Sequence, residues 1–172
     1  IRGDLNATRE NPAAYKKHVI PVIEKGDAYT WFHHGLLDVS TGQHGKDPNF
    51  TEPTFESLYE ATYGVAPSGD FYDAYKLVKS WRDALQKAFW VNKGNPNKDK
   101  LVAALNKMIN DPESVAAIEK KVGKYEWRTG ADGDAAVRTL KSFITPKALK
   151  TLADFKSDQL GYNTVYKEEL TK

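Results

Sequence analysis

Four histidines are the residues of this chain with the most varied potential chemistry: His18, His33, His34 and His44. His33 and His34 are adjacent, so on a strand their rings point to opposite faces and cannot bind one metal ion together. A metal site would need His34, His44 and a carboxylate such as Asp38 to converge across a loop, and this spacing matches no short metal-binding motif. We therefore interpret the histidines as surface or core residues and predict no metal and no cofactor. A metal-binding enzyme that uses the His33, His34 and His44 region is the alternative.

The segment Trp31-Phe32-His33-His34-Gly35 stands at the end of a predicted strand. In α/β sheets, ligands collect beyond the carboxyl ends of the strands. The aromatic rings, the two imidazoles and the backbone of Gly35 offer hydrogen bonds and contacts to a carboxylate, and function is often carried on such loops. In the plainer interpretation, Trp31 and Phe32 are core residues and the histidines cap a loop. The first interpretation makes Trp31, Phe32, His33, His34 and Gly35 candidate ligand-binding residues.

Thr54 is the remaining candidate ligand-binding residue. It stands at the predicted start of a helix, with Glu56 close behind it, and the unpaired N–H groups of a helix start favour anions. The alternative is that Thr54 only caps the helix. Asp132-Gly133-Asp134 lacks the other ligands and the closing glutamate of a calcium loop, so we interpret it as a turn and a helix cap.

Catalytic motifs are absent from the sequence. No serine has a Gly-x-Ser-x-Gly context, there is no glycine-rich phosphate loop, and nothing singles out a pair of carboxylates for acid–base work. We therefore predict no catalytic residue and a protein that is not an enzyme.

The elements that must position these residues are mostly helices. Helices are predicted near residues 11–23, 54–63, 71–87, 98–109, 113–122, 135–143 and 145–160. For His18–Ile23 a short strand is the alternative. Strands are predicted at Ala28–His33, Leu36–Val39, Ala88–Val91 and Lys124–Arg128, and a polar loop at Ser40–Pro53. Because strands and helices alternate, we predict a helix-rich α/β fold with a short, mostly parallel sheet.

Two helices have clear apolar faces. In 98–109, Leu101, Leu105 and Met108 are predicted core residues, and Pro112 ends the pattern with Asp111 as the cap of the next helix. In the longest segment, the predicted inward face consists of Phe71, Tyr75, Val78, Trp81 and Leu85, and Lys79 is predicted to face outward. The aromatic face of the Phe71–Trp90 segment is also a candidate surface for a helical protein-interaction module.

Composition indicates an ordinary globular chain of 172 residues, with 40% hydrophobic and 28% charged residues. The net charge is +2, and lysines alternate with acidic residues, so we predict no nucleic-acid partner. The absence of cysteine excludes disulfides, thiolate metal sites and a cysteine nucleophile. No apolar run approaches the length of a membrane span.

Three pieces of sequence together resemble a known family. They are Asp47-Pro48-Asn49-Phe50 with Glu52-Pro53-Thr54-Phe55-Glu56-Ser57-Leu58, then Phe89-Trp90-Val91 with Gly94-Asn95-Pro96, then Lys100-Leu101-Val102-Ala103-Ala104-Leu105 with Ile109-Asn110-Asp111-Pro112-Glu113. In this order they resemble the later half of the periplasmic solute-binding receptors of tripartite tricarboxylate transporters. The resemblance covers about Tyr29–Ile118, and the glycine-rich early segment of those receptors has no counterpart here.

The resemblance implies a fold and a function. It implies part of a periplasmic-binding-protein-like lobe, so that residues 1–172 are a single domain or a fragment of a two-lobed binding protein, with 161–172 as a possible frayed tail. It implies a periplasmic receptor that captures a small organic anion, such as a di- or tricarboxylate, for a membrane permease. We expect a monomer that binds its ligand without covalent chemistry.

Overall fold

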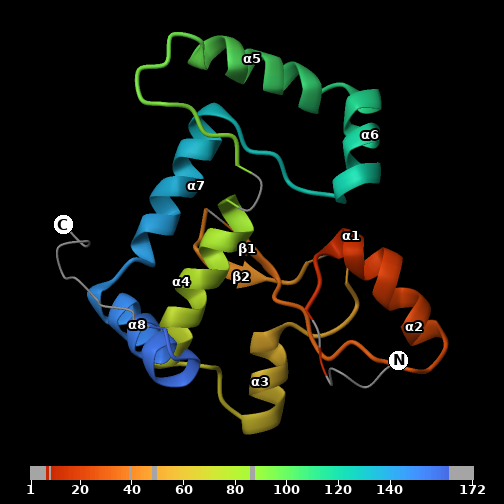
Figure 1. Ribbon diagram of the computed structural model, residues 1–172, viewed down its shortest axis with the longest axis vertical. Helices are drawn as coiled ribbons and strands as arrows, with labels where there is room; N and C mark the ends of the chain where they lie inside the picture. Colours follow the sequence, from red (N-terminus) through yellow and green to blue (C-terminus); the bar gives the residue numbers. More distant parts are fainter. Residues whose placement is uncertain (1–6, 8, 39, 48–49, 86–87, 163–172) are drawn as a thin grey trace. The chain divides into compact units, whose positions relative to one another are not determined.

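The computed structural model describes residues 7, 9–38, 40–47, 50–85 and 88–162 (Figure 1). It is helix-rich, as predicted. The chain divides into two compact units. Unit 1 combines the described residues up to Trp31 with Val91–Gly130, and unit 2 combines those of Phe32–Trp90 with the chain from Ala131 on. None of the helices in the described ranges is long and apolar enough to cross a membrane.

Unit 1 is made of helices. They are α1 (Pro12–Ala14), the π-helical turn η1 (Tyr15–Val19), α2 (Ile20–Glu24), α5 (Lys98–Ile109) and α6 (Pro112–Val122). Asn11 caps the first helix, because its Oδ1 accepts hydrogen bonds from the N–H groups of Ala13 and Ala14. The helix predicted near residues 11–23 is confirmed, and the strand alternative over His18–Ile23 is wrong.

The π-helical turn lies directly before Pro21. Proline has no N–H group with which to bond the carbonyl oxygen four residues earlier, that of Lys17. In η1 the N–H of Ile20 instead donates to the carbonyl oxygen of Tyr15, five residues back. The proline therefore widens this turn rather than ending the helix.

The pair α5 and α6 has the predicted boundaries but not the predicted burial. Asp111 caps α6 by accepting a hydrogen bond from the Ser114 N–H (3.0 Å), and Pro112 follows it at the first helical position. Leu101 is 44% exposed, and α5 has no fully buried residue among its twelve. The prediction of a core on this helix is wrong, because Leu101 is exposed and Leu105 and Met108 are only half-buried.

Unit 2 packs helices around α4. Its elements are α3 (Phe55–Tyr63), α4 (Asp70–Leu85), α7 (Gly130–Ser142, apart from its first residue), α8 (Pro146–Leu160), β1 (Leu36–Asp38) and β2 (Gln43–Gly45). Helix α8 runs along α4, where Lys147 pairs with Asp70 (2.6 Å) and Phe155 meets Phe71 edge-on (Figure 1). The fully buried apolar side chains of the described residues all lie in this unit: Leu37, Ala74, Leu77, Ala136, Leu140, Ala148 and Ala153.

The sheet differs from the predicted one. Strands β1 and β2 form a two-stranded antiparallel hairpin, in which Leu37 faces His44. The predicted strand at Leu36–Val39 is confirmed for its first three residues, and Val39 lies outside the described part. The expectation of a mostly parallel sheet is wrong, because the partner strand comes from the polar segment Ser40–Pro53, only a short turn away.

Three other predicted strands are not found. Within Ala28–His33 only His33 forms a bridge, which is parallel to Thr54, and neither Ala88–Val91 nor Lys124–Arg128 contains strand residues. These segments are rich in aromatic residues, which favour strands only where a neighbouring strand covers them. Without such a partner, Phe89 and Trp90 are 75% and 70% exposed.

Helix α4 buries a different face from the predicted one. Phe71, Val78 and Trp81 are exposed, whereas the buried residues are Ala74, Leu77, Lys79 and Ser80. The outward position predicted for Lys79 is therefore wrong.

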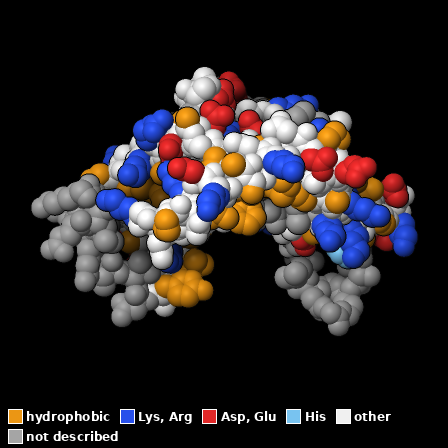
Figure 2. Space-filling model, turned by 90° about the horizontal axis from the view of Figure 1, so that it is seen from above, with side chains coloured by type: hydrophobic (Ala, Val, Ile, Leu, Met, Phe, Trp, Pro, Cys, Tyr) orange, Lys and Arg blue, Asp and Glu red, His pale blue; other side chains and the backbone are white. Residues whose placement is uncertain are grey.

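On the face drawn in Figure 2, charged side chains of both signs alternate with apolar ones.

The end of the chain contains one further correction. Asp132-Gly133-Asp134 is not a turn but lies within the first turns of α7. Helix α8 is capped by Thr145, whose hydroxyl accepts from the Ala148 N–H, and it ends at Gly161. In the predicted frayed tail, Gly161 and Tyr162 are bonded to the last turn of α8, and 163–172 lie outside the described residues.

Candidate functional site

The structure brings five of the six candidate ligand-binding residues together in unit 2. The His33 N–H donates to the carbonyl oxygen of Pro53 (2.9 Å), and the Phe55 N–H donates to that of His33 (3.0 Å). This bridge joins the 32–35 segment to the start of α3, next to Thr54. The ring of Phe32 lies 5.4 Å from that of His34 and 5.7 Å from that of Phe55. Trp31 belongs to unit 1 and is 66% exposed.

The His33 ring is buried, and its tautomer can be assigned. Its Nδ1 accepts a hydrogen bond from the Gly35 N–H (2.9 Å), so in the neutral ring the hydrogen lies on Nε2. The ring stacks on Phe50, and burial lowers the pKa of His33, opposed by the Asp47 and Glu52 carboxylates. Nε2 is buried and has no hydrogen-bond partner among the described residues. A neutral ring that carries its hydrogen on Nε2 has no lone pair there for a metal ion.

Gly35 and Thr54 both have structural roles. Gly35 has a φ of +71°, and an added Cβ would stand 2.2 Å from the carbonyl oxygen of Gly45, so no other residue fits against β2 here. Its N–H donates the hydrogen bond to Nδ1 of His33. The Thr54 hydroxyl accepts from the Ser57 N–H (3.1 Å), which is the capping role that the sequence offered as an alternative.

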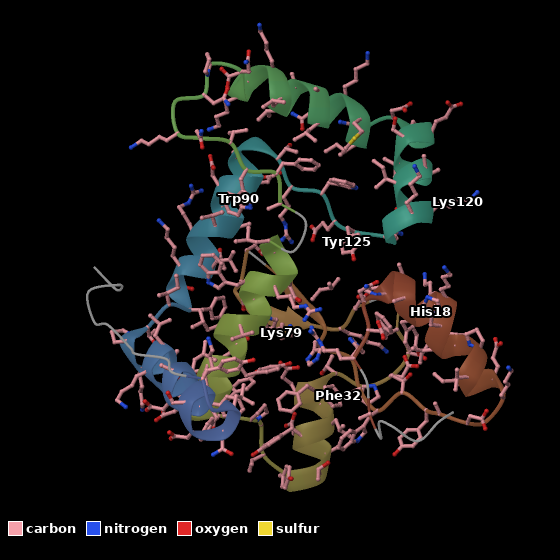
Figure 3. All side chains as sticks on the ribbon, in the orientation of Figure 1. His18, Phe32, Lys79, Trp90, Lys120 and Tyr125 are labelled. Atoms are coloured by element: carbon pink, nitrogen blue, oxygen red, sulfur yellow. The ribbon has the colours of Figure 1, made fainter. Side chains whose placement is uncertain are left out.

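Sequence reasoning missed a set of polar side chains on α4 that face these histidines. We call it the polar seam: His34 with Tyr75, His44 with Ser80, Lys79 with Asp83, and Tyr72 with Glu56. The atoms lie 2.8 Å apart in the His34–Tyr75 pair, 3.2 Å in the His44–Ser80 pair and 3.1 Å in the Lys79–Asp83 pair. Lys79, which is labelled on α4 in Figure 3, is only 5% exposed. Its position four residues after Tyr75 and directly before Ser80 was visible in the sequence, but its burial was not.

Burial governs the electrostatics of the seam. It lowers the pKa of Lys79, against the attraction of Asp83, and it raises the pKa of Asp83, against the attraction of Lys79. Burial, followed by the charge of Lys79, lowers the pKa of His34, and burial with Lys79 and Lys76 lowers that of His44 to about 4. At neutral pH both rings are therefore uncharged.

The tyrosines of the seam stay protonated. Burial, followed by the Glu56 carboxylate, raises the pKa of Tyr72 to about 12, and the same two causes raise that of Tyr75. The Tyr75 hydroxyl can then donate to Nδ1 of a neutral His34. Ser80 and His44 form a pair of the type that activates a serine nucleophile, but Ser80 is 0% exposed and out of reach of a substrate. Lys79 and Ser80 are the buried part of the seam, and its histidines and tyrosines are half-buried.

The alternative metal site of His34, His44 and Asp38 is not formed among the described residues. Asp38 is bonded within its own turn, where its carboxylate accepts from the hydroxyl and the N–H of Ser40, and these bonds lower its pKa to about 2. Within the described ranges, no group of three or more His, Cys, Asp or Glu side chains is arranged to hold a metal ion.

A pocket in unit 1 has a different character. It lies between the start of the first helix and the end of α6, has a volume of about 390 Å³, and is lined by Ala13, Lys16, Lys17, Glu119, Lys120, Gly123 and Lys124. Of the lining residues, Lys120 on α6 is labelled in Figure 3. Lys16 and Lys17 belong to the π-helical turn, a feature that is frequent at functional sites.

The end of α6 at this pocket has a backbone conformation that favours glycine. Gly123 ends α6 with a φ of +90°, and the Cβ of another residue there would lie 3.5 Å from the Cβ of Ala13. The lysines thus stand around one concave surface with Glu119 as its single acidic lining residue. The sequence shows Lys16-Lys17 and Lys120-Lys121 as ordinary charged pairs on helices, and only the fold brings them together.

Comparisons with models of protein families, with curated proteins and with solved structures find no match to this chain.

Proposed function

We propose that this chain binds a small organic anion, such as a di- or tricarboxylate, and passes it to a membrane permease as a periplasmic solute-binding receptor or a fragment of one. On this proposal the chain is part of a binding-protein lobe and is not an enzyme. Binding is non-covalent and needs no cofactor. The proposal takes its receptor role from the resemblance and its ligand class from the chemistry of unit 1.

The observation that carries the proposal is the lysine-lined pocket. Four lysines and one glutamate line it, so its surroundings carry a positive net charge that favours anions. A volume of about 390 Å³ suits a small molecule rather than a polymer. Helices α5 and α6, with the Asp111 cap between them, contain the last of the three pieces that carry the resemblance, and the end of α6 forms one side of the pocket.

Lysine side chains determine how such a ligand would be held. Their ammonium groups are compact point charges on flexible stems, without the two-pronged geometry that arginine offers to a carboxylate. Binding to this partly open site should therefore depend on the number of charges on the ligand more than on its shape. Binding should also weaken as salt is added, because in 0.1 M salt the attraction between exposed charges decays over a distance of about 10 Å.

Calorimetric titration tests the proposal. Succinate, citrate and tricarballylate should bind at low salt, and glucose should not. The double variant Lys16→Ala, Lys120→Ala should lose at least tenfold in affinity, at about 1 kcal/mol per lysine. Lys121→Ala is the matched control, since Lys121 is exposed on the same helix turn but does not line the pocket. If no organic acid binds, or if the control loses as much as the double variant, the proposal fails.

A second candidate function is a protein-interaction module. Phe71, Val78 and Trp81 are 72%, 48% and 37% exposed on α4, on the face that the sequence marked as apolar. Light scattering during size-exclusion chromatography addresses self-association: a concentration-dependent dimer that Val78→Ser, Trp81→Ser abolishes would favour this function. A monomer at all concentrations speaks against it.

A further inference from the structure

The polar seam joins three elements of unit 2 through titratable groups. His44 on β2 contacts Ser80 of α4, and His34, directly before β1, contacts Tyr75 of the same helix. Lys79 lies between these two positions in the helix and is buried. The hairpin is therefore held to α4 by two neutral imidazoles on either side of a buried lysine.

We propose that this arrangement is an acid-sensitive latch: protonation of His34 and His44 releases the β1–β2 hairpin and the 32–35 segment from α4. The latch acts within unit 2 and is independent of the lysine-lined pocket in unit 1. It goes beyond anion binding, because it gives the chain a state whose population depends on pH.

The charges around the two rings give the latch its direction. From α4, Lys79 and Lys76 act on His44, and Lys79 acts on His34 together with the neighbouring His33. The opposing acids are Asp83, which is bonded to Lys79, and Glu56 of α3, which acts on Lys79 and is bonded to Tyr72. Helix α8 meets α4 through Lys147 and Asp70 at the first turn of α4, and Phe143, which follows α7, offers His44 only its ring.

Protonation affects each histidine contact differently. An imidazolium at His34 must donate from Nδ1, so the Tyr75 hydroxyl becomes the acceptor and its hydrogen needs another partner in a half-buried place. At His44 the bond to Ser80 survives, since a hydroxyl can accept, but a second cation now stands near the ammonium group of Lys79 in a medium of low dielectric constant. Both changes favour the open state.

The pH range follows from the shifts. A solvent-exposed imidazole has a pKa of about 6.5, whereas burial lowers that of His44 to about 4 in the closed state. Between these two values the opened hairpin takes up a proton that the closed one does not, so opening becomes more favourable as the pH falls. Below about pH 4 the closed state is also protonated and the effect reaches its limit.

Hydrogen–deuterium exchange of the whole chain at pH 7 and pH 5, corrected for the intrinsic pH dependence of exchange, tests the latch. Peptides that cover β1 and β2 should gain more than tenfold in relative exchange at pH 5, whereas peptides from α5 should not change. His44→Gln should remove most of this gain, and His18→Gln, an exposed histidine of unit 1, should leave it intact. An equal gain in His44→Gln, or a gain in all peptides alike, overturns the proposal.

A second measurement covers the case in which His44→Gln does not fold. Histidine ring signals in NMR spectra of the unaltered chain report each protonation directly. The latch requires that the His44 ring titrates well below a free imidazole and that hairpin exchange rises over the same pH range. A His44 midpoint near that of a free imidazole overturns it.

Discussion

At the scale of single residues, Lys79 differs most from its expected role. The apolar pattern of α4 placed the larger aromatic residues inside and Lys79 outside. In the structure the small residues Ala74 and Leu77 pack inward, and the lysine is buried beside them with Asp83 one turn later. The apolar pattern of a helix does not by itself identify the buried face. The carbon chain of a lysine can pack against apolar residues, and aromatic side chains can lie at the protein surface.

The candidate histidines could be found from sequence, but their partners could not. His33, His34 and His44 are candidates because of their side-chain chemistry, and Gly35 is one because its backbone is accessible to a ligand. Tyr75 and Ser80 become visible only when the hairpin is placed against α4, which is a contact between segments about 40 residues apart. The lysine-lined pocket was equally hidden, because its two sides come from opposite ends of unit 1 in the sequence.

Lys79→Met should destabilise the protein by about 2–4 kcal/mol at neutral pH, because it leaves the carboxylate of Asp83 largely buried without a counter-charge. Adding Asp83→Leu should restore most of that loss, since a buried ion pair replaced by apolar residues of similar size is often neutral. Urea unfolding curves of both variants provide the measurement. A single variant as stable as the parent would show that the pair is more solvated than its burial indicates.

At the scale of elements, helices were predicted well because their signals are local. Caps at Asn11, Thr54 and Asp111, and the stops at Gly64 and Pro112, set boundaries within one turn of chain. Strands were predicted poorly because they depend on a partner. Ala88–Val91 has a suitable composition for a strand but no partner among the described residues, whereas the polar segment Gln43–Gly45 became a strand because β1 lies next to it.

Thr54→Ala should lower the free energy of unfolding by about 1 kcal/mol, because it removes the side-chain acceptor of the Ser57 N–H at the start of α3. Thr54→Ser keeps the hydroxyl and should cost much less. Both variants should bind organic acids as the parent does, since Thr54 lies in unit 2 and the pocket in unit 1. Chemical unfolding and calorimetry measure the two quantities separately, and a loss of ligand affinity in Thr54→Ala would return Thr54 to the binding site.

At the scale of the whole molecule, stability should be unevenly distributed. Within the described residues, every buried apolar side chain lies in unit 2, although both units also carry large apolar side chains that are exposed. The sequence did not indicate this difference, because helices of both units have apolar residues at helical spacing. The difference arises from what covers those residues, which depends on contacts far apart in the chain.

Hydrogen exchange should therefore be faster in unit 1 than in unit 2. Amides of α5 and α6 should exchange at least tenfold faster than those of α4 and α8 at neutral pH, since local opening exposes few buried contacts there. An anion bound in the lysine-lined pocket stabilises only the unit that holds it, by about 2.7 kcal/mol at a concentration one hundred times its dissociation constant. Saturating citrate should then slow exchange in η1 and α6 and leave α4 unchanged. Slowing centred on α4 instead would place the anion in unit 2, near the histidines, and not in the pocket.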